Sequence, residues 1–142
     1  MSTIRLEIVS PLRGEIYAND INMLIVRSIA GELGILPRHA RLLTELVPHV
    51  MRVKAEGGEI QIAVGGGFME VTPELITVLA NAAELEDAID VERAKAAYKR
   101  ASDRIAAYQS HSKDYGEIDI RRAENALARA KARLAVKGIK VD

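Results

Sequence analysis

Glycine and proline are almost confined to the first part of the chain, and alanine dominates the last part. All four prolines and eight of the ten glycines precede residue 88, where they mark turns between short segments. Residues 88–136 hold thirteen alanines and one glycine. Alanine is the best helix former because it loses no side-chain entropy in a helix. The chain is therefore expected to contain a turn-rich unit at residues 1–87 and a helical unit at residues 88–142.

Apolar residues alternate with other residues in the first unit, and this period of two predicts β-strands. Gly57 and Gly58 predict a hairpin turn. The alternation favours an all-β sandwich or barrel, with strands that include residues 4–8, 21–25, 51–54, 60–64 and 75–79. Three consecutive glycines at 65–67 interrupt this pattern and predict a bulge or a close backbone approach.

Apolar residues of the second unit recur every three or four positions, which predicts two helices at about 88–109 and 119–137. Asp90 and Asp119 are expected to cap their N-termini. The polar residues 110–116 are expected to form the connecting loop. The fold class is therefore α+β, a β unit followed by an antiparallel helical hairpin. Because the apolar faces consist mainly of alanine, the helices should pack closely but with little stabilisation, and the hairpin should also dock weakly on the β unit.

The composition excludes several classes of function. The 142 residues contain no cysteine, so disulfides and thiolate chemistry are absent. The net charge of 0 argues against nucleic acid as a partner. No apolar run approaches the ~20 residues that span a bilayer, and no histidine stands at metal-ligand spacing with carboxylates. An enzyme that works alone is not expected.

The arginines of the second unit are the best candidates for a binding site. Arg129 and Arg133 are four residues apart, so they share one helix face, and antiparallel pairing would bring Arg93 beside them. Guanidinium groups bind phosphate oxygens in pairs, and the start of the first helix adds a positive dipole end. Glu84 and Asp90 are acceptors suited to a base amino group or a ribose hydroxyl. From spacing alone, a phosphate site and a solvated charged face both remain open.

Three segments of the chain form a specific set of motifs, and they read GELGILPRHA at 31–40, VGGGFMEV at 64–71 and LANAAE at 79–84. They resemble the epsilon subunits of bacterial F-type ATP synthases, and the resemblance covers nearly the whole chain. Two positions depart from the usual pattern. Arg38 stands where these proteins often have glycine, and Gly65 stands where they often have serine. Arginine at position 38 would resist a left-handed backbone.

The resemblance implies a non-catalytic rotor subunit at the cytoplasmic face of the bacterial cell membrane. It implies that the β-sandwich, residues 1–87, binds the gamma subunit and rests on the rotor ring, with Glu32 and His39 in the loop that faces these partners. It also implies that the hairpin, residues 88–142, inhibits ATP hydrolysis when it extends into the catalytic head of alpha and beta subunits. The complex as a whole couples proton transport to ATP synthesis.

Part of this family binds ATP as a regulatory ligand on the folded hairpin. The matching motif here is Ile89-Asp90-Val91-Glu92-Arg93-Ala94. The resemblance implies that Glu84, Arg129 and Arg133 complete the site together with Ile89, Asp90, Arg93 and Ala94. It does not specify whether magnesium accompanies the ATP. The alternative is a purely structural stalk adaptor with no functional nucleotide site.

Overall fold

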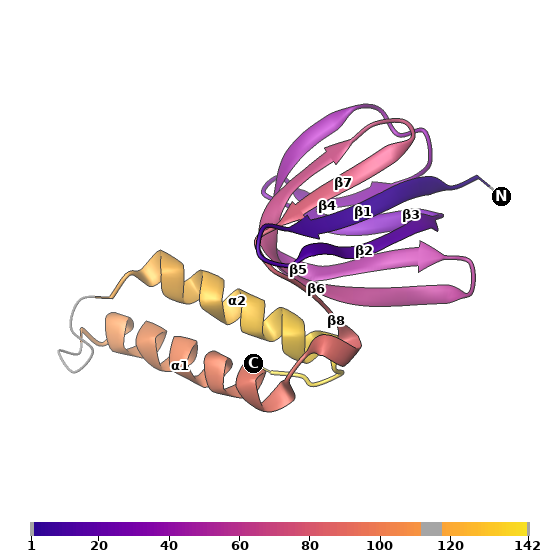
Figure 1. Cartoon of the computed structure of the whole chain (residues 1–142). Coiled ribbons are helices and arrows are strands. Elements are labelled where there is room, and N and C mark those ends of the chain that lie inside the picture. Colours follow the sequence, from indigo (N-terminus) through magenta and orange to yellow (C-terminus); the bar gives the residue numbers. More distant parts are fainter. Residues whose placement is uncertain (1, 112–117, 142) are drawn as a thin grey trace.

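The computed structural model describes residues 2–111 and 118–141. Eight strands form one hydrogen-bonded sheet that folds over into two layers, and two helices follow it (Figure 1). The strands are β1 (Ile4–Ser10), β2 (Gly14–Ile21), β3 (Met23–Ser28), β4 (Gly31–Ile35), β5 (Leu42–Ala55), β6 (Gly58–Val71), β7 (Leu75–Ala80) and β8 (Ala83–Leu85). A 3₁₀ turn (Glu86–Ala88) leads to α1 (Val91–Gln109) and α2 (Ile120–Val136). The predicted fold class, a β-sandwich followed by a helical hairpin, is confirmed.

The sheet has the strand order β2-β1-β7-β6-β5-β3-β4, and β8 pairs with β6. All neighbours are antiparallel except β1 and β7, which are parallel. The two long strands β5 and β6 extend through both layers and enclose the core. Large aliphatic side chains such as Leu6, Leu24, Met51, Ile62 and Ile76 fill this core and are fully buried.

The expected strand at 21–25 is wrong in its detail, because the chain turns a corner at Asn22. Ile21 ends β2 with its side chain buried, and Met23 begins β3. After the corner the buried side chains are Leu24 and Val26, so the inward face changes parity. In the sequence, the alternation of apolar residues continues across Asn22, so it gives no sign of this corner.

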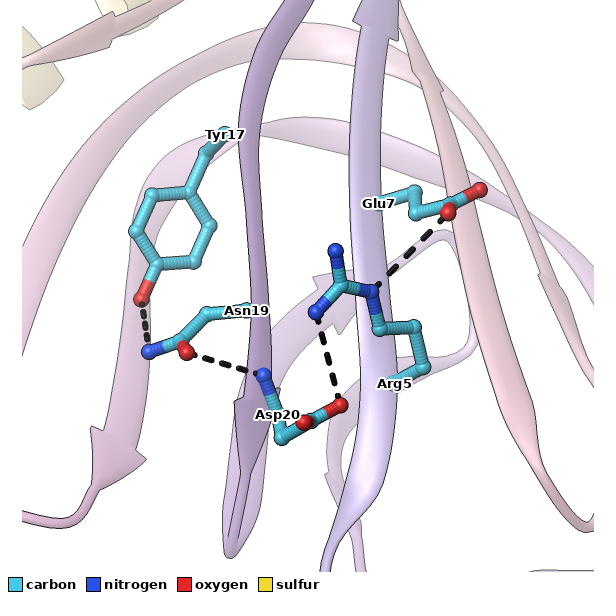
Figure 2. Close-up of polar contacts among 5 residues, drawn as sticks. All are labelled: Arg5, Glu7, Tyr17, Asn19 and Asp20. Carbon is cyan, nitrogen blue, oxygen red and sulfur yellow. Dashed lines mark hydrogen bonds and ion pairs between the residues drawn. The ribbon is translucent and has the colours of Figure 1, made fainter.

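Polar contacts join side chains of β1 and β2 (Figure 2). Arg5, Glu7 and Asp20 lie on the outer face, whereas Tyr17 and Asn19 lie opposite the buried Ile8 and Leu6, and Tyr17 packs against the core. Arg5 lies opposite Asp20 in the register, and their side chains are 3.4 Å apart. The Tyr17 hydroxyl accepts a hydrogen bond from the Asn19 amide at 3.1 Å. Such exposed contacts add little stability. They do mark the edge strand β2 as polar, which discourages pairing with another sheet.

Of the two alternatives predicted for the glycines at 65–67, the close backbone approach is confirmed and a bulge is not. The β5–β6 register is the same before and after them, with Leu46 opposite Gly67 and Pro48 opposite Gly65, while the second partner of β6 changes here from β8 to β7. Gly67 has a φ of 143°, and a Cβ there would overlap the carbonyl oxygen of Leu79. Only glycine fits this position.

The turn at Arg38 adopts a left-handed backbone with a φ of 64°. Arginine therefore occupies the conformation that the sequence suggested it would resist. The Arg38 N–H donates to Pro73 O at 3.1 Å, and the His39 N–H donates to Leu36 O at 3.2 Å. These hydrogen bonds offset the cost of the strained residue, which is about 1–2 kcal/mol.

Both predicted helix caps are confirmed. The Asp90 and Asp119 carboxylates accept hydrogen bonds, each at 3.1 Å, from the backbone N–H groups of Arg93 and Arg122. The first helix begins at Val91 and not at 88, because Ile89 and Asp90 are extended and Glu86–Ala88 form a separate 3₁₀ turn. The expected loop at 110–116 lies mostly outside the described residues.

The hairpin is joined to the sandwich by α2. A small apolar cluster forms this junction from Ala63 of β6, Ile89 of the linker, and Ala132 and Val136 of α2, with Val50 of β5 packed against it. The seam between the helices buries Ala94, Ala101, Ala107, Ala123, Ala130 and Leu134. A buried methyl contributes only about 0.8 kcal/mol. Because the junction cluster is small and partly alanine, weak docking of the hairpin stays a prediction.

We expect Gly67→Ala to destabilise the protein far more than Gly57→Ala. Both glycines have positive φ values, so both substitutions introduce backbone strain of about 1–2 kcal/mol. Only the Cβ at position 67 also meets backbone atoms, so we expect a total loss of about 3 kcal/mol or more there. Urea unfolding of both variants measures this, and equal losses would contradict the close-approach role.

Protonation of His49 is expected to destabilise the fold. His49 is buried, its Nδ1 lies 2.6 Å from Val47 O, and its Nε2 has no hydrogen-bond partner in the described chain. Burial, with a smaller contribution from the positive charge of Arg27, lowers the pKa of His49 despite the hydrogen bond to Val47. The unfolded chain then binds more protons than the folded one, so stability falls as pH drops below about 6.5.

The expected loss at His49 is up to about 1.4 kcal/mol per pH unit below 6.5. His49→Gln should show a flatter stability profile between pH 7 and 5 than the parent chain. His39→Gln, at a position that is only partly buried, is the control and should follow the parent. Identical profiles for all three proteins would show that His49 titrates normally in the folded state.

Candidate functional site

A cavity of about 410 Å³ lies between the sandwich and the hairpin. Its walls come from the β1–β2 turn, residues 81–84, the linker before α1, and both helices. This volume is in the range of small-molecule sites. The cavity is lined by four arginines and two acids, namely Arg13, Arg93, Arg100, Arg133, Glu84 and Asp90. Much of the remaining lining is alanine, so the charged side chains are the groups that can select a ligand.

Glu84 and Arg133 are bound to each other in this structure. The Arg133 Nε donates to Glu84 Oε1 at 2.5 Å. Their side chains are 27% and 20% exposed, so the ion pair is partly buried. It joins α2 to β8, and it satisfies one of the two acids that line the cavity. Any anion that binds Arg133 has to compete with Glu84.

Asp90 and Arg93 lie where α1 begins. Asp90 uses one carboxylate oxygen to cap the helix through the Arg93 N–H, so that N–H is not available to a ligand. The Arg93 side chain is exposed and lines the cavity. Ala94 also lines it and is buried. Ile89 does not line the cavity, because its side chain lies in the apolar cluster under α2.

Arg129 lies beside a different and smaller cavity. That cavity has about 180 Å³ and is lined by Gly65, Asn81 and Asn125, among others. The aliphatic part of Arg129 covers Gly65, where a Cβ would be 3.0 Å from Arg129 Cδ. Burial, followed by the positive charges of Arg133 and Arg122, lowers the pKa of Arg129. The structure thus brings Arg93 and Arg133 to one cavity and places Arg129 at its neighbour.

The sequence interpretation missed two of the four cavity arginines. Arg100 follows Arg93 by seven residues, which is two helical turns, so helical spacing alone is a sufficient signal for it. Arg13 belongs to the turn between β1 and β2, and its proximity to the hairpin is a matter of tertiary packing. No local sequence signal reveals that proximity.

Glu32 and His39 lie elsewhere on the sandwich. Glu32 belongs to β4 and not to a loop, and it pairs with Arg27 of β3 at 3.6 Å. His39 lies partly exposed in the turn after β4, with its Nδ1 2.7 Å from Ala40 O. The exposed apolar residues Ile29 and Leu36 flank β4 at its two ends.

Two further searches concern metals and membranes. Within residues 2–111 and 118–141, no group of three or more histidine and acidic side chains is arranged to hold a metal ion. Neither α1 nor α2, as described, is long and apolar enough to cross a membrane.

Comparison with known proteins places both units in one family. The beta-sandwich domain of the ATP synthase delta/epsilon chain matches residues 3–86, and the long alpha-helix domain of the same chain matches residues 87–138. The ATP synthase epsilon chain of Bacillus velezensis is 46% identical over 97% of this chain and 99% of its own length. That of Alkalihalophilus pseudofirmus is 48% identical over 81% of this chain and 86% of its own.

A solved structure supports the fold. A chain in the cryo-EM structure of the Euglena gracilis mitochondrial ATP synthase, which contains OSCP, F1 and the c-ring, superimposes with a TM-score of 0.76. The match covers 96% of this chain and 82% of that chain, at 22% identity. The sequence relatives match both units over nearly their full length, and the resemblance identified from the sequence motifs is confirmed. The chain therefore belongs to the ATP synthase delta/epsilon family, as an epsilon chain of the F-type ATP synthase central stalk.

Proposed function

We propose that this epsilon chain is a non-catalytic regulator whose folded hairpin binds ATP and whose extended hairpin inhibits ATP hydrolysis. The observation that carries this proposal is the cavity whose walls come from the sandwich, the linker and both helices. Arg93 and Arg133 line it together with Glu84 and Asp90, so groups suited to phosphate and to hydroxyl or amino groups face one space.

The cavity exists only while the hairpin is folded, because its walls belong to separate units. A ligand that binds one state alone stabilises that state by RT ln(1 + [L]/Kd), which is about 2.7 kcal/mol at a hundredfold excess over Kd. A free energy of this size reverses a preference of one or two kcal/mol. The small apolar cluster under α2 is consistent with a preference of that order.

The sandwich is proposed to bind the gamma subunit and the rotor ring at the cytoplasmic face of the bacterial cell membrane, where the complex couples proton transport to ATP synthesis. Phe68 of β6 and Leu79 of β7 are register partners on the outer surface of the sheet and are 53% and 55% exposed. A large exposed aromatic–aliphatic pair suits a protein partner better than water. Glu32 and His39 are proposed as further partner contacts, and the alpha and beta subunits as contacts of the extended hairpin.

A purely structural adaptor is the competing function. In that case the charged cavity is a solvated surface, and the hairpin only clamps the gamma subunit. The Glu84–Arg133 ion pair favours this alternative to the extent that it neutralises two of the proposed ligands. Equilibrium titration of the purified chain with ATP distinguishes the regulator from the adaptor, because a purely structural adaptor has no nucleotide site and should not bind ATP.

Arg93→Ala and Arg133→Ala should each weaken ATP binding ten- to hundredfold. Each loses a charged hydrogen bond to the ligand, roughly 1.5–3 kcal/mol, and about 1.4 kcal/mol corresponds to a factor of ten. Arg121→Ala is the matched control, because Arg121 is exposed on α2 and does not line the cavity. Calorimetric titration gives the affinities, and an equal loss in all three variants would indicate a general charge effect and not a site.

ATP should hold the hairpin against the sandwich. The chain has no cysteine, so Glu56→Cys in the β5–β6 turn and Gln109→Cys at the end of α1 accept a pair of distance labels without background. We expect a short, narrow distance distribution with ATP and a broader one without it. Arg93→Ala should require more ATP for the same change and should deepen inhibition of hydrolysis in the assembled complex. If the distance distribution between the two labels is the same with and without saturating ATP, the proposed switch is wrong.

A further inference from the structure

We propose that the β1–β2 turn, residues 11–13, forms a second side of the nucleotide site, with Arg13 as a ligand of the phosphates and Leu12 as an apolar contact for the base. This inference deepens the proposed ATP site and rests on it. The turn connects Ser10, at the end of β1, to Gly14, at the start of β2. In Figure 1 it lies at the end of β1 remote from the N-terminus. Ser10, Leu12 and Arg13 all line the cavity.

Arg13 is an arginine of the sandwich that lines the cavity and has no side-chain partner among the described residues, whereas Arg38 and Arg41, which also lack one, do not line the cavity. Arg5, Arg27 and Arg52 each form an ion pair with an aspartate or glutamate. The Arg13 side chain is exposed and makes no ion pair or hydrogen bond with another residue in the described parts of the chain. Residues 1–87 carry seven basic and twelve acidic side chains, so partners are plentiful in this unit. An unpaired guanidinium at this cavity is therefore available to an external anion.

The charge of the cavity defines the class of ligand. Arg133 is neutralised by Glu84, and Asp90 caps α1. Arg13, Arg93 and Arg100 are then the uncommitted cations, and they face one uncompensated carboxylate. The cavity has an excess of two positive charges in this count. Such an excess suits a ligand with several negative charges, such as a nucleoside triphosphate, better than a nucleoside or a monoanion.

Leu12 supplies the apolar part of the site. Its side chain is 94% exposed at the rim of the cavity, next to Arg13. A single exposed leucine is ordinary. Here, however, it is the one large aliphatic side chain in a described lining that otherwise consists of charged and small residues. A flat purine base that covers Leu12 would remove it from water while the phosphates reach Arg13.

The position of Arg13 has a consequence for the two units. Arg13 belongs to the sandwich, whereas Arg93 and Arg100 belong to α1. A polyanion that binds all three is a bridge between the sandwich and the first helix. On the side of the hairpin, the described members of the apolar cluster at the junction come from the linker and α2, and none from α1. The nucleotide would therefore add a link to α1 that this cluster does not provide.

Titration of the full chain and its variants with ATP and with inorganic tripolyphosphate tests this inference. Arg13→Ala should weaken both ligands about tenfold and should reduce the dependence of affinity on salt. Leu12→Ser should weaken ATP about threefold and leave tripolyphosphate unchanged, because only ATP carries a base. Arg41→Ala is the control, since Arg41 is an exposed arginine of the sandwich that does not line the cavity.

The outcomes separate this inference from the function on which it rests. Failure of the parent chain to bind ATP would contradict both. Normal binding by the parent, with Arg13→Ala within twofold of it, would overturn the role of Arg13 and leave the ATP site intact. Equal losses in Arg13→Ala and Arg41→Ala would show an effect of net charge and would also overturn it. Unchanged melting temperatures of the variants confirm that a loss of affinity is not a loss of fold.

Discussion

The contact between α2 and the sandwich is the interaction on which the candidate site depends. It consists of a few small apolar side chains, such as Ala63 and Ala132, and of the Arg133–Glu84 ion pair. Each alanine methyl contributes about 0.8 kcal/mol, and desolvation offsets much of the attraction in a partly buried ion pair. We therefore expect the junction that assembles the cavity to have low stability. A stronger junction would make the cavity permanent and would remove any means for a ligand to control it.

A nucleotide that binds Arg133 has to displace Glu84, so the ion pair has both a favourable and an unfavourable effect on binding. A phosphate that takes Arg133 gains a charged contact, but it releases the Glu84 carboxylate in a partly buried position. The same release frees Glu84 to accept from a ribose hydroxyl or a base amino group. A nucleotide can bind Arg133 through a phosphate and also give Glu84 a new hydrogen-bond donor, whereas inorganic phosphate can only bind Arg133. The ion pair therefore favours ligands that combine a phosphate with hydroxyl or amino donors.

The main division of the fold could be predicted from the sequence, because local chemistry determines it. Alanine composition and the caps at Asp90 and Asp119 specify the helices, and the glycines at 65–67 specify the close approach to β7. The site was harder to predict. Arg129 and Arg133 share a helix face, but Arg133 lines the larger cavity and Arg129 lines the smaller one. Arg13 and Leu12 reach the site through tertiary packing, and no periodic pattern in the sequence indicates such a contact between distant segments. The 14–21 and 31–35 strands lack a regular apolar alternation and were missed for that reason.

The charges of the two units bear on how a ligand acts. Residues 1–87 carry a net charge of −5 and residues 88–142 a net charge of +5, so their overall attraction favours the folded hairpin. That attraction is screened beyond about 8 Å at physiological salt. At short range the sign reverses, because the cavity gathers the positive charges of Arg13, Arg93 and Arg100. A bound polyanion removes this local repulsion in addition to making its own contacts. On the proposed function, the cavity arginines would therefore oppose the folded state when they are alone and support it when the anion is bound, and the strength of the proposed switch would follow from that change of sign.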